Sequence, residues 1–199
     1  MTTKSEHKQY ICVYAASSVK LAPEYHAQAA NLGRLIGQAG HTLVYGAGGI
    51  GLMGAVARAV HEYNGRVIGV VPERLNKPGI VYPDTDELIV TDTMRERKAW
   101  MEERADAFIV LPGGYGTLEE MLEIVVLRQL FYTQKPLVLL NIKGAYDAFI
   151  AFIDHLVEED FIKREHRELF HTVDSPEAAL SYIASYEPEP LSPKLEIIP

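Results

Sequence analysis

A glycine-rich turn followed by two glutamates is the part of this chain best suited to chemistry. A short apolar run of strand length, residues 107–111, precedes the turn, and helical spacing from Met121 to Leu130 follows it. Glycines let the backbone adopt positive φ and approach a ligand closely, while the first amides of a helix and its dipole attract an anion. We therefore expect a phosphate to bind at Gly113, Gly114, Tyr115, Gly116 and Thr117.

The same turn also allows a purely structural interpretation. The sequence Thr-Leu-Glu-Glu over residues 117–120 has the pattern of a capping box, in which Thr117 caps the helix and Glu120 returns a hydrogen bond to it. A turn from strand to helix can require glycines for its geometry alone. The turn by itself leaves both interpretations open.

A second candidate is an arginine on the helix predicted over residues 93–104, directly before the strand that leads to the turn. At about 100° per residue, one line of side chains is expected to face the core: Met94, Met101 and Ala105. Arg97 borders this line without an acid three or four positions away, whereas Lys98 has Glu102 at i+4. A guanidinium there needs a carboxylate or a phosphate from elsewhere in the chain or from a ligand.

A second glycine-rich loop follows the second predicted strand. Gly46, Gly48 and Gly51 match the spacing Gly-x-Gly-x-x-Gly that places backbone amides against a dinucleotide. Such a loop normally follows the first strand and has an acid about 20 residues on, but here an earlier strand precedes it and Glu73 comes later. We therefore disfavour a nucleotide-dependent oxidoreductase. Whether the loop, including Gly49, contacts a ligand or only packs a helix on the sheet stays open.

The elements that must position these residues alternate along the chain. Strands are predicted at residues 10–15, 42–45, 66–71, 87–91, 107–111, 136–140 and 169–173. Helices are predicted at residues 23–40, 52–63, 93–104, 117–131, 145–159 and 176–186. This alternation predicts an α/β fold: a Rossmann-like, doubly wound, mostly parallel sheet with helices on both faces. Ligands bind at the carboxyl ends of such strands, where both glycine loops and the pair Ser17 and Ser18 are expected.

Length and composition fit one domain over residues 1–199. At 48% hydrophobic content the chain can fill a single core, expected over residues 9–186, with an irregular proline-rich tail at 187–199. A formal charge of −8 argues against a nucleic-acid partner or an anionic membrane surface, and we find neither a signal peptide nor a membrane span. We expect a cytoplasmic protein with Cys12 packed in the core and, since its histidines are scattered, no metal site.

The long segment over residues 72–86 holds three prolines and has little periodicity. Long loops in compact domains are often functional, so we expect this one to serve the site.

The helix over residues 117–131 becomes apolar on both faces. Its first half carries acids opposite an apolar side, and one turn later apolar residues replace the acids: Ile124, Leu127, Leu130 and Phe131. Such a helix is buried on both sides, within one subunit or against a partner. In a domain of this size we favour a partner and predict a two-fold homodimer.

Three motifs together closely resemble those of the Lonely guy (LOG) family: Pro112 to Glu120, Met94 to Lys98 and Tyr45 to Gly54. Members of this family are cytokinin riboside 5′-monophosphate phosphoribohydrolases. They are often labelled lysine decarboxylases, a label that does not suit a chain without the pattern of a pyridoxal phosphate site. The resemblance implies hydrolysis of the N-glycosidic bond of an N6-modified adenosine 5′-monophosphate without a cofactor. It also implies a homodimer whose partner contributes to the site.

By motif, the resemblance implies that Arg97 and Glu120 are the catalytic pair. It further implies a phosphate loop at Gly113, Gly114, Gly116 and Thr117, with Lys98 beside the arginine and Glu119 in the substrate-contacting segment. Glu120 would stabilise the cationic ribose that develops during bond cleavage and orient or deprotonate water. Arg97 would serve either the phosphate or the departing base.

Three positions depart from the family pattern. Ala16 replaces the glycine before the serine pair, Ala47 interrupts a run of glycines, and Gly79 stands where members carry a substrate-contacting glutamate. The last difference bears on the preferred base more than on the reaction. The alternative function is a non-catalytic carrier of a nucleotide or of the molybdenum cofactor on the same fold, which the presence of both candidate catalytic residues disfavours.

Overall fold

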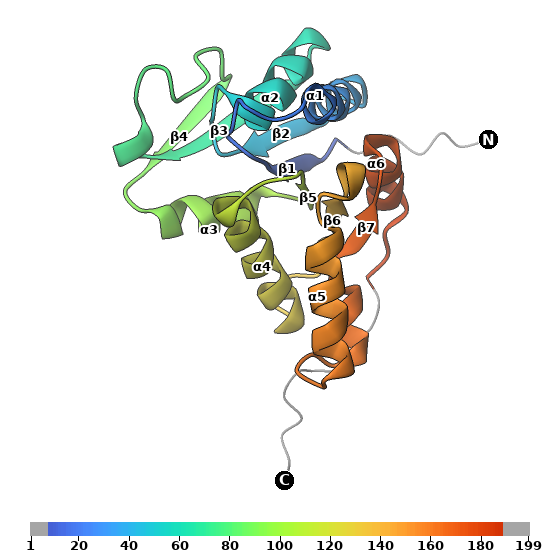
Figure 1. Cartoon of the computed structure of the whole chain (residues 1–199). Helices are drawn as coiled ribbons and strands as arrows, with labels where there is room; N and C mark the ends of the chain where they lie inside the picture. Colours follow the sequence, from blue (N-terminus) through green and yellow to red (C-terminus); the bar gives the residue numbers. More distant parts are fainter. Residues whose placement is uncertain (1–7, 189–199) are drawn as a thin grey trace, which may run out of the picture.

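A computed structural model describes residues 8–188 of the chain, and strands alternate with helices throughout them (Figure 1). The strands are β1 (Tyr10–Tyr14), β2 (Thr42–Tyr45), β3 (Arg66–Pro72), β4 (Glu87–Thr91), β5 (Ala107–Val110), β6 (Leu137–Leu140) and β7 (His171–Val173). The α-helices are α1 (Pro23–Gln38), α2 (Gly51–Glu62), α3 (Met94–Arg104), α4 (Tyr115–Gln129), α5 (Asp147–Glu158) and α6 (Pro176–Ser185). Short 3-10 helices are η1 (Glu73–Leu75), η2 (Ile142–Gly144) and η3 (Arg164–Leu169).

The strands form one sheet in the order β4-β3-β2-β1-β5-β6-β7. Every neighbouring pair is parallel, and on the central strand Cys12 lies opposite Val44 of β2 and Phe108 of β5. The chain runs outward from β1 to β4 on one side and from β5 to β7 on the other, so the strand order reverses between β1 and β5. This confirms the predicted doubly wound sheet, and the sheet is wholly parallel within the described residues.

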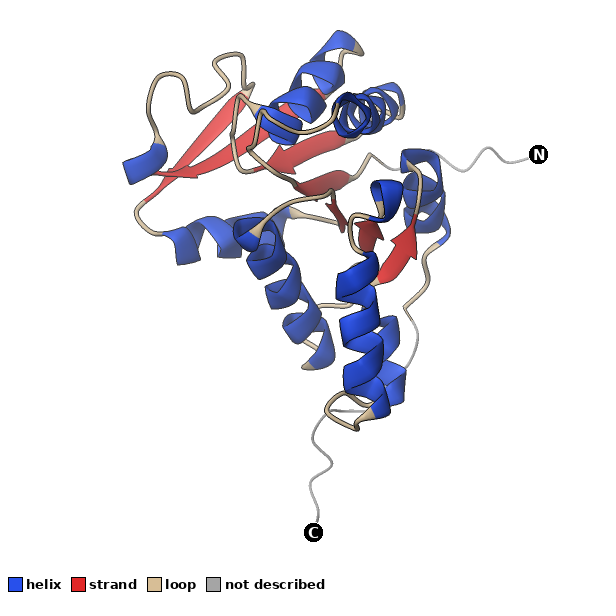
Figure 2. Ribbon diagram, in the orientation of Figure 1, coloured by secondary structure: helices blue, strands red, loops and turns tan. Residues whose placement is uncertain are grey.

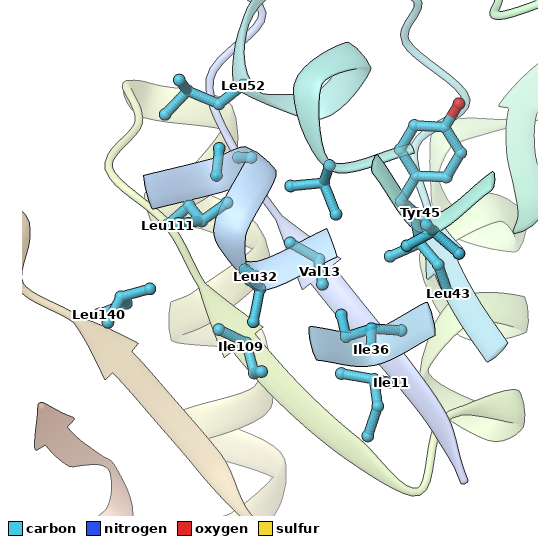
Figure 3. Close-up of a cluster of buried hydrophobic side chains, with 14 of the residues drawn as sticks. Ile11, Val13, Leu32, Ile36, Leu43, Tyr45, Leu52, Ile109, Leu111 and Leu140 are labelled. Atoms are coloured by element: carbon cyan, nitrogen blue, oxygen red, sulfur yellow. The ribbon is translucent and has the colours of Figure 1, made fainter. Parts of the chain in front are cut away.

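Helices cover both faces of the sheet (Figure 2). One face is packed by α1, α2 and α6, through residues that include Leu32, Val56 and Ile183. The other is packed by α3, α4 and α5, through residues that include Met101, Met121 and Ile153. Alternate residues of β1 serve the two layers, because side chains of a strand point alternately to its two faces. Ile11 and Val13 join the first layer (Figure 3), and the fully buried Cys12 joins the second, as expected.

Backbone hydrogen bonds tie together the loops at the carboxyl edge of the sheet. The amide of Ala16 donates to the carbonyl of Pro112 at 3.2 Å, and the amide of Leu52 donates to Ala16 at 2.9 Å. The amide of Gly49 donates to the carbonyl of Ile80 at 2.8 Å. The loops after β1, β2, β3 and β5 are therefore one connected surface rather than independent segments.

Several boundaries in the structure differ from the predicted ones, and part of the predicted tail falls outside the described residues. The segment over residues 72–86 is not entirely loop, because it begins with the end of β3 and then η1. Of the tail predicted over residues 187–199, only Glu187 and Pro188 are described, and neither lies in a helix or a strand. No helix within residues 8–188 is both long enough and apolar enough to cross a membrane.

Candidate functional site

A cavity of about 510 Å³ opens at the carboxyl edge of the sheet, beside the point where the strand order reverses. Open α/β sheets bind their ligands at this position. The loops after β1, β2, β3 and β5 wall the cavity together with the first turns of α3 and α4. Most of the predicted site residues line it: Ser17, Ser18, Gly46, Gly48, Arg97, Gly114, Tyr115, Gly116, Thr117 and Glu120. Four do not: Gly49, Lys98, Gly113 and Glu119.

Arg97 and Glu120 form a buried ion pair in the wall of this cavity. Nη1 of Arg97 donates to Oε1 of Glu120 at 2.6 Å, and Nε donates to the carbonyl of Val70 at 3.0 Å. The two side chains are only 9% and 11% exposed. The acid that Arg97 lacks on its own helix is thus supplied by α4, and the two residues singled out by separate motifs meet in one place.

Burial raises the pKa of the Glu120 carboxyl above its usual value of 4.5, while the neighbouring charge of Arg97 acts in the opposite direction. Desolvation is the larger effect because the carboxylate loses water on most sides and gains one cation. A carboxyl with a raised pKa next to a cavity is well suited to exchanging protons with a bound water or substrate.

Helix α4 begins at Tyr115, and Gly114 is its N-cap, so no side chain caps its first turn. The predicted capping box is wrong: Thr117 lies inside the helix, and Glu120 bonds to Arg97 instead of returning to the cap. A charged hydrogen bond to a guanidinium is stronger than one to a backbone amide, which explains the preference. The first turn of α4 holds no acid, so its free amides and dipole face the cavity uncompensated.

The three glycines of this turn provide space rather than unusual backbone angles. Glycine permits positive φ, but Gly113, Gly114 and Gly116 do not adopt it. A Cβ on Gly113 would lie 2.0 Å from Oγ1 of Thr117, so this glycine lets the first helical turn fold back on the loop. At Gly114 and Gly116 a Cβ would meet nothing within 4 Å, and both positions border open cavity.

The second glycine loop makes room for the arginine. A Cβ on Gly46 would lie 2.1 Å from Nη2 of Arg97, whereas a Cβ on Gly48 would meet the side chain of Met53, most closely its terminal Cε at 2.5 Å. Gly49 turns away and lines a neighbouring cavity of about 630 Å³. Ala47, which interrupts the glycine run, adopts a φ of 61°, a conformation that favours glycine.

Lys98 and Glu119 bond to each other outside the cavity. Lys98 also pairs with Glu123 at 3.0 Å, so the lysine joins α3 to α4. The expected pairing of Lys98 with Glu102 on its own helix is replaced by these contacts. They hold the helix that carries Arg97 against the helix that carries Glu120.

The cavity also has an apolar lining that was not predicted from the sequence. It includes Met53, Leu75, Ile80 and Met94. The prediction that Met94 faces the core is wrong, because the residue is 45% exposed and lines the cavity. Leu75 and Ile80 belong to the long segment over residues 72–86, and the length of that segment was the only feature of the sequence that pointed to them as site residues.

Known protein structures of similar fold include two molybdenum cofactor proteins. The molybdenum cofactor binding protein of Rippkaea orientalis has a TM-score of 0.68 at 23% identity, with 91% of this chain and 98% of that chain covered. The molybdenum cofactor carrier protein of Chlamydomonas reinhardtii has a TM-score of 0.66 at 21% identity, with 89% and 97% covered. At this level of identity the similarity establishes the fold alone.

Sequence comparison is more specific. Residues 53–183 match a family model described as "Possible lysine decarboxylase". The chain is 42% identical to cytokinin riboside 5′-monophosphate phosphoribohydrolase LOG of Oryza sativa subsp. japonica, over 90% of this chain and 74% of that protein. It is 41% identical to the enzyme LOG7 of Arabidopsis thaliana, over 94% of this chain and 86% of that protein. The chain therefore belongs to the LOG family, to which its glycine turn and arginine motif had pointed.

Proposed function

We propose that this protein hydrolyses the N-glycosidic bond of an adenosine 5′-monophosphate, with or without an N6 substituent, to release the free base and ribose 5-phosphate. The observation that carries the proposal is the buried pair of Arg97 and Glu120 beside the uncapped first turn of α4. The named activity of the relatives in rice and Arabidopsis supports the same reaction.

In this proposal the phosphate binds at the amides of Tyr115, Gly116 and Thr117, because they are the first amides of α4 and no side chain caps them. Ser17 and Ser18 also line the cavity, and their hydroxyls can donate further hydrogen bonds to the phosphate oxygens.

The anchored phosphate would bring the ribose near Glu120, one turn along α4 from the amides. The bond between C1′ and N9 breaks with its electron pair passing to the base, and the oxygen of a water bonds to C1′. Glu120 accepts a proton from that water and stabilises the positive charge developing on the ribose. The released base takes up a proton. Arg97 holds the Glu120 carboxylate in place and adds positive charge next to the phosphate or the departing base.

The base would lie against the apolar lining of the cavity. Leu75, Ile80 and Met94 are 44%, 40% and 45% exposed, so a bound base or an N6 substituent would bury apolar surface that now faces water. These contacts are compatible with both plain and substituted adenine.

We further infer that the protein forms a homodimer through the outer face of α4. Exposed apolar side chains gather there and just beyond the helix end: Leu122, Val126, Leu130, Phe131 and Tyr132. Phe131 also holds a φ of 61°, an unfavourable position for a large side chain that an interface contact would offset.

The reaction is tested by incubating the protein with AMP or with isopentenyl-AMP and measuring the released free base by chromatography. Glu120→Gln should lower the rate by about 10²- to 10⁴-fold, because the carboxylate can no longer accept a proton. The matched control is Glu123→Gln on the same helix, whose side chain bonds to Lys98 outside the cavity and should leave the rate nearly unchanged.

Intact nucleotide after prolonged incubation, together with tight binding, would contradict hydrolysis and favour the carrier function. Equal losses in both glutamine variants would also contradict the proposed role of Glu120, because only one of these carboxylates reaches the cavity.

A further inference from the structure

Arg128 ends the core-facing stripe of α4 with a charged group. The stripe consists of Thr117, Met121, Ile124 and Arg128, and all four residues are buried. Nη2 of Arg128 donates to the hydroxyl of Tyr186 at 2.8 Å, while Nη1 has no hydrogen-bond partner within residues 8–188. Over the same range, no carboxylate forms an ion pair with it. The guanidinium is therefore buried without a carboxylate partner, and Tyr186 offsets its charge only in part, through its hydroxyl and through its ring, whose centroid lies 5.6 Å from Cζ of Arg128.

Burial of this kind is unfavourable for the folded protein. Only 7% of Arg128 is exposed, and desolvation lowers the pKa of its guanidinium. An unpaired buried cation costs stability that an apolar side chain of similar size would not. The contrast with Arg97, which is equally buried but paired to a carboxylate, suggests that Arg128 lacks its anion.

A cavity of about 350 Å³ lies beside Arg128, large enough for a small organic ligand. It is formed where α4 and α6 end and β7 begins, at the amino edge of the sheet, and none of its lining residues lines the nucleotide cavity. Aromatic rings wall it: His171 stacks on Tyr182 with 3.9 Å between ring centroids, and Tyr186 follows at 5.6 Å from Tyr182.

We propose that this cavity is a second ligand site, in which Arg128 binds the carboxylate of a small, flat monocarboxylate whose ring packs against His171, Tyr182 and Tyr186. The proposal does not depend on the proposed reaction at the other edge of the sheet.

The charges around the cavity disfavour a doubly charged anion. Glu168 and Glu187 also line it, and both are exposed. With histidine neutral, these two acids outweigh the one arginine, so a phosphate dianion would be repelled more strongly than a monocarboxylate. The guanidinium of Arg128 lines the cavity, so a planar carboxylate can accept a charged hydrogen bond from it while the ligand's ring covers aromatic surface.

Benzoate is a suitable probe, and binding to the full chain can be followed by calorimetry and by thermal unfolding. Benzoate should raise the unfolding midpoint more than benzamide, which has the same ring without the charge, or inorganic phosphate. Arg128→Met should weaken benzoate binding by at least about ten-fold, since the charged hydrogen bonds are lost. Without ligand, this variant should be no less stable than the wild type, because a buried unpaired charge is removed.

Arg97→Met is the matched control, because it removes a buried arginine from the nucleotide cavity and should leave benzoate binding intact. Tyr186→Leu, which removes an aromatic ring that lines the cavity, gives a second variant expected to bind benzoate more weakly. The proposal is overturned if Arg128→Met unfolds or is strongly destabilised, or if benzoate has no effect on the wild type. It is also overturned if the benzoate effect disappears in Arg97→Met but persists in Arg128→Met.

Discussion

Glu120 is subject to two opposing effects that decide its protonation. The Arg97 guanidinium 2.6 Å away favours the carboxylate, and loss of water favours the neutral acid. The balance lies with desolvation, so the pKa is raised even inside an ion pair. A carboxyl of this kind can take a proton from water without being fixed permanently in one charge state.

The raised pKa predicts a titration midpoint for Glu120 above 4.5 in the ligand-free protein. Carboxyl carbon NMR measures it directly, with the resonance assigned by its absence in Glu120→Gln. Because the reaction needs the carboxylate, kcat/KM should fall as the pH falls through this raised value. A midpoint below 4.5 would mean that attraction by Arg97 exceeds the cost of burial, contrary to our interpretation.

A substitution at Gly46 tests the position of Arg97 without replacing a charged residue. A Cβ at Gly46 would lie 2.1 Å from Nη2 of Arg97, so Gly46→Ala should displace the guanidinium and lower kcat/KM by about 10²-fold. Gly48→Ala is the control in the same loop, since its Cβ meets the flexible end of Met53 at 2.5 Å and that side chain can move. Similar rates for both variants would show that the position of Arg97 is not critical.

At the level of elements, apolar periodicity predicted the strands well and the helix starts less well. The predicted strands at residues 42–45 and 87–91 match β2 and β4, because short buried runs between turn residues leave little freedom in their ends. The start of α4 was placed at Thr117 because its sequence fits a capping box, yet the helix begins at Tyr115. Glu120, the glutamate of that pattern, forms a hydrogen bond with Arg97 instead. The two residues are 23 positions apart, so the sequence around either one does not reveal the contact.

The junction between α2 and the loop after β1 depends on Gly51, which has a φ of +61°. A Cβ there would also lie 2.5 Å from the backbone carbon of Ser17. Gly51→Ala should therefore lower the free energy of unfolding by more than the roughly 1–2 kcal/mol expected for left-handed backbone alone. Gly79→Ala isolates that smaller effect, since its φ is +81° and a Cβ would meet nothing within 4 Å. Denaturant titration compares the two, and equal losses would exclude the steric contribution.

For the molecule as a whole, the order of strands and helices was enough to predict the topology. Parallel strands joined by helices allow few arrangements, so a reversal of strand order with ligand-binding loops at the carboxyl edge could be expected. The sequence could not indicate which loops share one cavity. Glu119 and Lys98 are next to the catalytic candidates in sequence but lie outside the cavity, whereas Leu75 and Ile80 come from a loop without a motif.

The proposed homodimer through α4 can be tested with a charged substitution on the outer face of that helix. If α4 forms a two-fold interface, a charge at Val126, which is 46% exposed on its outer face, would be buried against its own copy in the partner. Val126→Glu should therefore convert a dimer into a monomer in light-scattering measurements, and lower activity as well if the partner completes the site. Phe152→Glu on α5 is the control, because Phe152 is 56% exposed but lies on another helix. A monomeric wild type, or a dimer lost only in Phe152→Glu, would place the interface elsewhere or exclude it.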